Sequence, residues 1–148
     1  MRPDPPIVLF GVAAALQELL PQVADPYGQQ TVGISASLVA MLAQEWDRAP
    51  ARLWEENEAI RELLARGAAL PGLAPEVRER LEEGSQAPAH PGARLSELQA
   101  ENDRLRALLI ELHAIVEEME GEEARHLEEA IWAELVASTR RRHVESGL

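Results

Sequence analysis

Between residues 95 and 119 the chain reads LSELQAENDRLRALLIELHAIVEEM, and this stretch decides the fold class. Its apolar positions recur in alternating steps of three and four residues, which is the spacing of one face of an α-helix. Two core registers of a heptad repeat follow: one holds Leu95, Asn102, Leu109 and Val116, and the other holds Leu98, Leu105, Leu112 and Met119. The pattern predicts a long, coiled-coil-like helix.

Two features of this helix bear on its partners. Leu108 and Ile115 flank the seam at positions where a two-stranded zipper usually carries charge, so the apolar stripe is wide enough to touch more than one neighbouring helix. Asn102 occupies a core register, and a single buried Asn often fixes alignment or partner choice. We therefore favour an intramolecular bundle, with a homodimer as the alternative.

Helical spacing also covers the first part of the chain. A first helix is predicted over residues 9–23, after an extended start at Pro3, Pro5 and Pro6. A turn is expected at Asp25-Pro26-Tyr27-Gly28. The next apolar stripe keeps its phase from about residue 30 to 66 across Pro50, which favours one long helix kinked at Pro50 over two separate helices.

The remaining elements surround a connection rich in Pro and Gly. Residues 67–94 contain four prolines and four glycines, so they cannot form one regular element, although residues 76–83 favour a short helix. We expect residues 85–93 to be the preferred site of limited proteolysis. Gly121 interrupts the apolar stripe. It either separates the helix that begins at residue 95 from a last helix ending near residue 143, or bends one continuous helix; we favour a turn at 120–122 between two helices. The prediction is a single all-α domain over residues 1–148, a bundle of four main helices plus the short one.

Composition narrows the function. The net charge of −12 opposes binding to nucleic acid, and the cluster Arg140 to Arg142 is best explained as a helix end whose carbonyls attract cations. The chain has no Cys, which excludes disulfides and thiolate metal sites. The apolar run from Ile7 to Leu16 is too short to span a bilayer and lacks the flanks of a signal peptide, so we expect no membrane contact and a cytoplasmic location.

No catalytic or cofactor motif is recognisable. A carboxylate-bridged dimetal bundle needs two Glu-x-x-His units, and only Glu123 to His126 has that spacing. His113 and Glu117 lie one helical turn apart but form an incomplete ligand set. Phosphate-binding loops and nucleophile elbows are likewise missing from the sequence. We predict no catalytic, cofactor-binding or metal-ligating residues and no cofactor.

Five residues stand out for packing or interaction. The Glu56-Asn57 and Glu101-Asn102 segments each place an Asn in an apolar stripe, so we expect Asn57 and Asn102 to be buried and to pair with each other, within one chain or across a dimer axis. Trp46, Trp54 and Trp132 lie at or beside apolar stripes, which favours a place in the core or in an interface. A ligand pocket lined by these tryptophans is the alternative.

Several short motifs recur in a known family. They are Leu20-Pro21, Glu45-Trp46, Glu56-Asn57 and the Leu-rich segment 104–109. With them the layout resembles an uncharacterised bacterial all-helical family whose members are found alongside acyl-CoA dehydrogenases and aminoglycoside-phosphotransferase-like kinases. The resemblance implies an accessory or partner protein and carries over no catalytic residue. We therefore expect a non-enzymatic helical accessory protein that acts through contacts with another protein or with itself; the alternative is a bundle that binds a small molecule or a metal.

Overall fold

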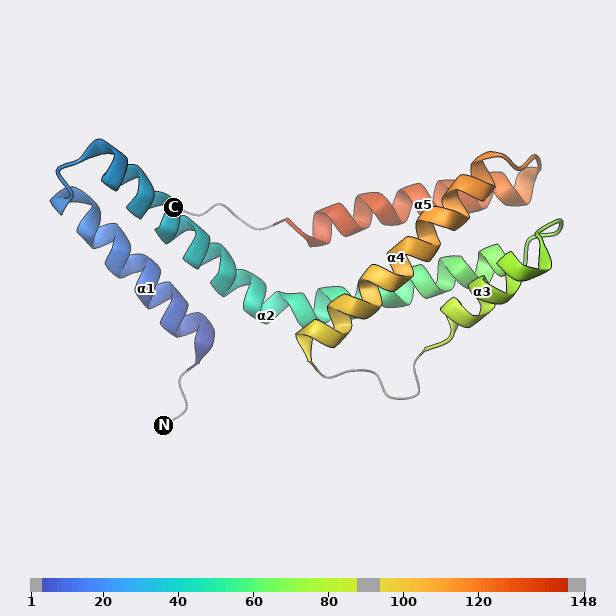
Figure 1. The fold of residues 1–148 in the computed structure, drawn as a ribbon, viewed down its shortest axis with the longest axis horizontal. Helices are drawn as coiled ribbons and strands as arrows, with labels where there is room; N and C mark the ends of the chain where they lie inside the picture. The colour runs from blue at the N-terminus through green and yellow to red at the C-terminus, as the bar shows by residue number, and fades with distance from the viewer. Residues whose placement is uncertain (1–3, 88–93, 144–148) are drawn as a thin grey trace. The chain divides into compact units, whose positions relative to one another are not determined.

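The computed structural model describes residues 4–87 and 94–143, and every regular element in these ranges is helical (Figure 1). The order is α1 (Pro5–Leu19), the 3₁₀ turn η1 (Leu20–Gln22), α2 (Pro26–Ala68), α3 (Pro75–Ser85), α4 (Leu95–Glu117) and α5 (Glu122–Arg141). The predicted all-α class is confirmed. None of the helices in the described ranges combines the length and apolarity that a membrane span requires.

Two helix starts differ from the sequence prediction, and proline explains both. Helix α1 begins at Pro5 instead of near residue 9, because a proline in the first turn lacks only an N–H that would have no helical partner anyway. The predicted turn at 25–28 is displaced toward the N-terminus for the same reason: the break between the helices lies at residues 23–25, and Pro26 already opens α2. Asp25 lies just before it and accepts a hydrogen bond of 2.7 Å on Oδ2 from the Gly28 N–H.

Helix α2 runs without a break from Pro26 to Ala68, a length of 43 residues with Pro50 inside it. The continuous helix expected from the unbroken apolar phase is therefore present. The last helix also agrees with its expected position, since α5 starts at Glu122 after Gly121. Gly121 has φ of 123°, a conformation that L-residues with a side chain rarely adopt, and this makes it a suitable break between α4 and α5.

The chain divides into two compact units. The hairpin unit consists of residues 1–49 and 143–148, and the bundle unit consists of residues 50–142. Helix α2 contributes its first part to the hairpin unit and its second part to the bundle unit. In the hairpin unit, α1 and the first part of α2 run antiparallel and are joined through η1 (Figure 1).

The bundle unit has a continuous apolar core made from all four of its helical segments. Its buried members include Ile60 and Leu64 from α2, Leu81 from α3, Leu105, Leu109, Leu112 and Val116 from α4, and Leu127 and Ile131 from α5. Both predicted registers of α4 are represented. Leu108 is partly buried against this core, so the wide stripe of α4 contacts more than one helix, as an intramolecular bundle requires.

The Pro/Gly-rich connection is partly ordered by its own helix. Helix α3 spans Pro75–Ser85, slightly beyond the predicted 76–83. Arg78 on α3 donates to the carbonyl of Leu70 at 2.9 Å and also to that of Ala68, which satisfies acceptors at the end of α2. Of the segment expected to be cut by proteases, residues 88–93 lie outside the described residues.

Candidate functional site

The bundle unit buries a polar cluster next to its apolar core. Glu56 and Asn102 have no exposed surface, Asn57 is 2% exposed and Ser138 is 6% exposed. Helix α2 supplies Glu56 and Asn57, α4 supplies Asn102, and α5 supplies Ser138. Three helices that are distant in sequence thus meet at one polar position.

Hydrogen bonds connect these side chains directly. Asn102 Nδ2 donates to Asn57 Oδ1 at 2.9 Å and is 3.4 Å from Glu56 Oε2. Asn57 Nδ2 donates to the Leu98 carbonyl at 3.4 Å. Ser138 Oγ donates to Glu56 Oε1 at 3.1 Å. The pairing of Asn57 with Asn102 that the sequence favours is therefore present within one chain.

Arginines surround Glu56 and compensate its buried charge. Arg142 donates from Nε to Glu56 Oε1 at 3.1 Å and from Nη2 to Oε2 at 2.6 Å, a two-pronged contact. Arg52 and Arg106 each place a guanidinium nitrogen 3.8 Å from a Glu56 oxygen. Burial by itself would raise the pKa of Glu56, but the hydrogen bonds and charges of Arg142, Ser138 and Arg52 hold that pKa below its ordinary value.

The cluster Arg140 to Arg142 lies at the C-terminal end of α5, and two of its arginines form ion pairs. Arg140 and Arg141 lie in the last turn of α5, where the helix dipole favours positive charge. Arg141 also pairs with Glu134, and Arg142 pairs with Glu56. The helix-end explanation of the three arginines agrees with these contacts.

A second network lies one helical turn away on the same two helices. Arg61 donates to Glu101 at 2.8 Å and to Glu58 at 2.6 Å, and Glu101 also accepts two hydrogen bonds from Arg104. The hydrogen bonds from Arg104 lower the pKa of Glu101, with burial acting against them and Arg61 adding to them. Both Glu-Asn segments therefore use their Glu as well as their Asn to join α2 and α4.

The three tryptophans are not core residues. Trp46 is 56% exposed, Trp54 48% and Trp132 52%, so the expectation of core packing does not describe them, and the interface alternative is the one their exposure allows. Trp132 on α5 makes an edge-to-face contact with His113 on α4, with ring centroids 5.2 Å apart and an interplanar angle of 84°.

His113 also faces two carboxylates. Within the described residues, His113, Glu117 and Glu128 form the one group of three whose ligand atoms all lie within 4.8 Å of one another. Glu117 follows His113 by one turn of α4, and Glu128 comes from α5. The sequence offered His113 and Glu117 as a pair; Glu128 joins them only because α4 and α5 pack together.

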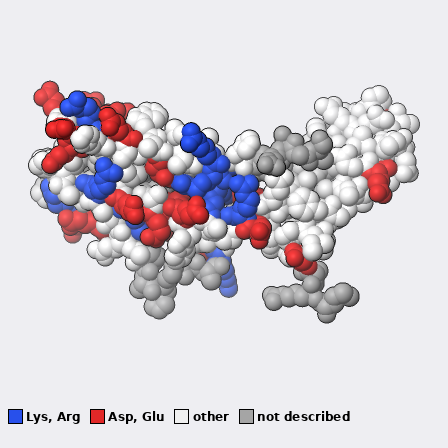
Figure 2. All heavy atoms as spheres, turned by 180° about the vertical axis from the view of Figure 1, so that it is seen from behind, with Lys and Arg blue, Asp and Glu red and all other residues white. Residues whose placement is uncertain are grey.

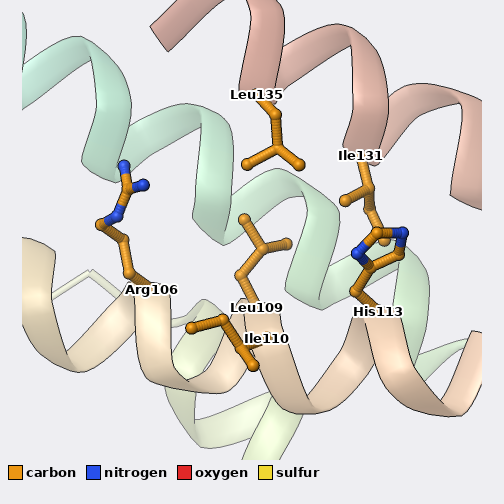
Figure 3. Close-up of a pocket in the computed structure, with 6 residues that line it drawn as sticks. All are labelled: Arg106, Leu109, Ile110, His113, Ile131 and Leu135. Carbon is orange, nitrogen blue, oxygen red and sulfur yellow. The ribbon is translucent and has the colours of Figure 1, made fainter. Parts of the chain in front are cut away.

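A shallow groove between α4 and α5 adjoins His113 (Figure 3). Its lining is mostly apolar, with His113 and Arg106 as its polar members, and the remaining lining residues are Leu109, Ile110, Ile131 and Leu135. Neither a carboxylate nor a hydroxyl nucleophile lines it. The groove therefore offers an apolar surface with an imidazole beside it, and no acid–base pair.

The hairpin unit has an unusual distribution of side-chain sizes. Its buried residues in the described range are all alanines, namely Ala13, Ala36, Ala40, Ala43 and Ala49. Eleven of its large apolar residues are between 41% and 78% exposed, namely Ile7, Val8, Phe10, Val12, Leu19, Tyr27, Ile34, Leu38, Met41, Leu42 and Trp46. The others, Leu9, Leu16, Leu20, Val23, Val32 and Val39, are half-buried. The fully buried positions of this unit are thus small, while most of its large apolar side chains remain exposed.

The spacing along α2 shows that these are two opposite faces. Ala36, Ala40 and Ala43 follow each other at steps of four and three, and so do Ile34, Leu38 and Met41. The second set is displaced by two residues from the first, which corresponds to about 200° of helix rotation. The exposed stripe therefore lies on the back of the helix, away from the alanine contact.

Charge is sparse in α1 and the first part of α2 as far as Gln44, although Glu45, Asp47 and Arg48 follow within the same unit. Between Pro5 and Gln44 the chain carries two acidic residues, Glu18 and Asp25, and no basic residue. In Figure 2 the surface of the hairpin unit is nearly all white, whereas that of the bundle unit mixes acidic and basic patches. Between Pro5 and Gln44, only Glu18 and Asp25 add charge to the exposed apolar side chains.

The buried Glu56 was missed by sequence reasoning, although a signal existed. Glu56 lies three residues after Leu53 and four before Ile60, both of which are buried, so its position belongs to the core stripe. We expected burial only for its neighbour Asn57. The charge partner Arg142 is 86 residues away in sequence, and its role could be recognised only once α2 and α5 were seen together.

Comparisons with known proteins find no relative for this chain: no protein-family model matches it, and neither does any curated protein or solved structure.

Proposed function

We propose that this protein is a non-enzymatic helical accessory protein that acts through protein–protein contacts, and that the exposed apolar face of the hairpin unit is the contact surface. The observation that carries the proposal is that eleven large apolar side chains of the hairpin unit are exposed, while its fully buried residues in the described range are all alanines. The resemblance to an uncharacterised bacterial all-helical family, which implies an accessory protein, would agree with such a role. A cytoplasmic location also remains a prediction.

The size of the exposed surface supports this proposal. Contiguous apolar patches on monomeric proteins seldom exceed about 300–600 Å², and larger ones mark interaction sites. The hairpin unit exposes eleven large apolar side chains. Full burial of such a side chain contributes about 1.5–3 kcal/mol, so partial burial of all eleven would offset an association cost of about 4–15 kcal/mol.

A second copy of the chain is the occupant that the charge pattern favours. A charged partner would find little to pair with between Pro5 and Gln44, whereas two identical, nearly uncharged faces repel each other weakly. Two helical hairpins that pack face to face form a four-helix bundle, a common architecture for symmetric dimers. We therefore propose a homodimer formed through the Ile34, Leu38 and Met41 stripe together with α1.

Sedimentation equilibrium on the full chain tests the homodimer. The wild type should have twice the monomer mass of 16.3 kDa at micromolar concentration. Leu38→Glu places a charge in the proposed contact and should shift the protein to monomer. Ile110→Glu is the matched control: Ile110 is 71% exposed on α4 in the bundle unit, so the same change there should leave the dimer intact.

The outcomes separate the alternatives. A monomeric wild type would refute the homodimer, and failure of the monomer to bind apolar helical peptides as well would refute the contact surface. Binding to lipid vesicles that Leu38→Glu abolishes would assign the face to a membrane surface instead. Dissociation by Ile110→Glu but not by Leu38→Glu would place the dimer contact on α4.

Two finer points of the fold belong to the same proposal. We propose that Pro50 kinks α2, because the residue has no N–H to bond to the carbonyl four residues before it. We also propose the arrangement predicted from the sequence: a bundle of four main helices, the second of them kinked at Pro50, with α3 as the additional short helix. The second candidate function is a bundle that binds a metal or a small molecule, and it is favoured by the cluster of His113, Glu117 and Glu128.

A further inference from the structure

We propose that His113, Glu117 and Glu128 bind one divalent transition-metal ion, with Zn²⁺ as the reference case. The proposal is independent of the homodimer, because all three residues belong to α4 and α5 of the bundle unit. Three observations support it: the three ligand atoms lie close together, the His113 Nε2 atom lacks a hydrogen-bond partner, and a ring contact with Trp132 holds the imidazole in place.

The three side chains already converge. One ligand atom from each lies within 4.8 Å of the other two, so small rotations of the carboxylates would bring them to the spacing around one ion. Zinc binds His nitrogen at about 2.0–2.1 Å and carboxylate oxygen at about 2.0–2.2 Å, usually in tetrahedral geometry. Three protein ligands then leave a fourth position for water.

The imidazole nitrogen that faces the carboxylates lacks a hydrogen-bond partner. His113 Nε2 is buried from solvent and makes no hydrogen bond, although it lies 3.5 Å from Glu117 Oε1. An ion pair with a protonated His would normally close to about 2.7–2.9 Å. A buried, unpaired polar atom costs about 1–3 kcal/mol, and a metal bond to Nε2 would remove that cost.

The surroundings suit a cation that binds a neutral imidazole. Glu117 is half exposed, with 51% of its side chain accessible, which gives an ion a path from solvent. The edge-to-face contact with Trp132 restricts rotation of the His113 ring and so preorganises the nitrogen. The two carboxylates neutralise the charge of a divalent ion. One nitrogen and two oxygens favour Zn²⁺, Co²⁺ or Mn²⁺ over soft ions.

Isothermal titration of the tag-free full chain with Zn²⁺ is the primary test. We expect one site per chain with micromolar affinity. Loss of even an outer-shell partner typically weakens a metal site about 10–100-fold, so His113→Gln and Glu128→Gln should each weaken binding at least about tenfold. His126→Gln and Glu129→Gln are matched controls: both residues are exposed on α5 beside Glu128, and their loss should leave the affinity unchanged.

Fluorescence supplies a second readout at the same site. In a Trp46→Phe/Trp54→Phe background, Trp132 is the remaining tryptophan, and Co²⁺ should quench it because the proposed ion binds the imidazole that Trp132 contacts. Glu117→Gln should reduce that quenching, and it should leave the fold intact, because half of the Glu117 side chain is exposed to solvent.

Two results would overturn the metal site. One is the absence of Zn²⁺ binding in a folded wild type, which would leave the cluster as an ordinary His–carboxylate contact. The other is binding that His126→Gln removes and that His113→Gln, Glu117→Gln and Glu128→Gln all leave intact, which would place the ion elsewhere on α5. Circular dichroism of each variant establishes that the fold is retained before affinities are compared.

Discussion

Replacing Glu56 by Gln should strongly destabilise the bundle unit. Gln keeps the size of the side chain but removes its negative charge. The positive charges of Arg142, which lies 2.6 Å from the Glu56 carboxylate, and of Arg52 and Arg106 then lose their counter-charge. Breaking a buried ion pair costs about 3–5 kcal/mol when the other charge stays buried. Arg142 is 42% exposed and Arg106 38%, so water recovers part of this loss. We expect about 2–4 kcal/mol.

Urea unfolding, followed by circular dichroism and extrapolated to water, measures this difference. Glu55→Gln is the matched control, because Glu55 is the preceding residue on α2 and is exposed. An exposed substitution of this kind normally changes stability by less than about 0.5 kcal/mol. A Glu56→Gln protein as stable as Glu55→Gln at neutral pH would refute the reasoning, because the buried charge would then contribute nothing net.

The same pair of proteins predicts a pH dependence. The pKa of Glu56 is lower in the folded protein than its ordinary value of 4.5, so the unfolded chain binds more protons between the two values. The stability that Glu56 contributes is therefore complete above pH 4.5 and is lost as the pH falls through the folded-state pKa. The difference between wild type and Glu56→Gln should shrink below that pH. A difference that grows on acidification would contradict the assignment.

Three further predictions concern packing. Asn57→Ala and Asn102→Ala should be non-additive by about 0.5–3 kcal/mol in a double-mutant cycle, because their amides share a 2.9 Å hydrogen bond, and additive losses would contradict the pairing. Asn102→Leu should alter amide exchange in the bundle unit even if the melting temperature rises; an unchanged exchange map would contradict a role in alignment. Gly67→Ala should lower the melting temperature, because a Cβ there would lie 2.6 Å from Cδ1 of the fully buried Leu112, whereas Gly11→Ala, with open space around it, should not.

Periodic patterns made the bundle predictable. The stripe of α4 identified six of its buried residues, because a helix that packs on a core must repeat its apolar positions every three to four residues. The two ends of the predicted seam differ: Leu95 is exposed, and Met119 lies beyond the last residue of α4 and is only partly buried. The continuity of α2 through Pro50 was predictable for the same reason. Helix starts at Pro5 and Pro26 were misplaced, since proline signals a break in a helix interior but is favourable in a first turn.

Contacts between distant segments were the part that the sequence could not provide. Asn57 and Asn102 were recognisable as a pair because each interrupts an apolar stripe. Glu56 with Arg142, and Glu128 with His113, carry no local signal, since a Glu on a helix is usually a solvated residue. Only the packing of α5 against α2 and α4 brings these groups together. The exposure of the three tryptophans was hidden for the same reason, because periodicity identifies a stripe but not what covers it.

The distribution of charge explains how a chain with such an apolar hairpin can remain dispersed before it finds a partner. Two of the 26 acidic residues and none of the 14 basic residues fall between Pro5 and Gln44, so nearly all of the net charge of −12 belongs to the rest of the chain. Like charge on that part opposes unspecific association at long range. Apolar burial acts only at contact, and it requires two faces that fit. If the proposed homodimer forms, this distribution would discourage random aggregation while permitting one matched contact.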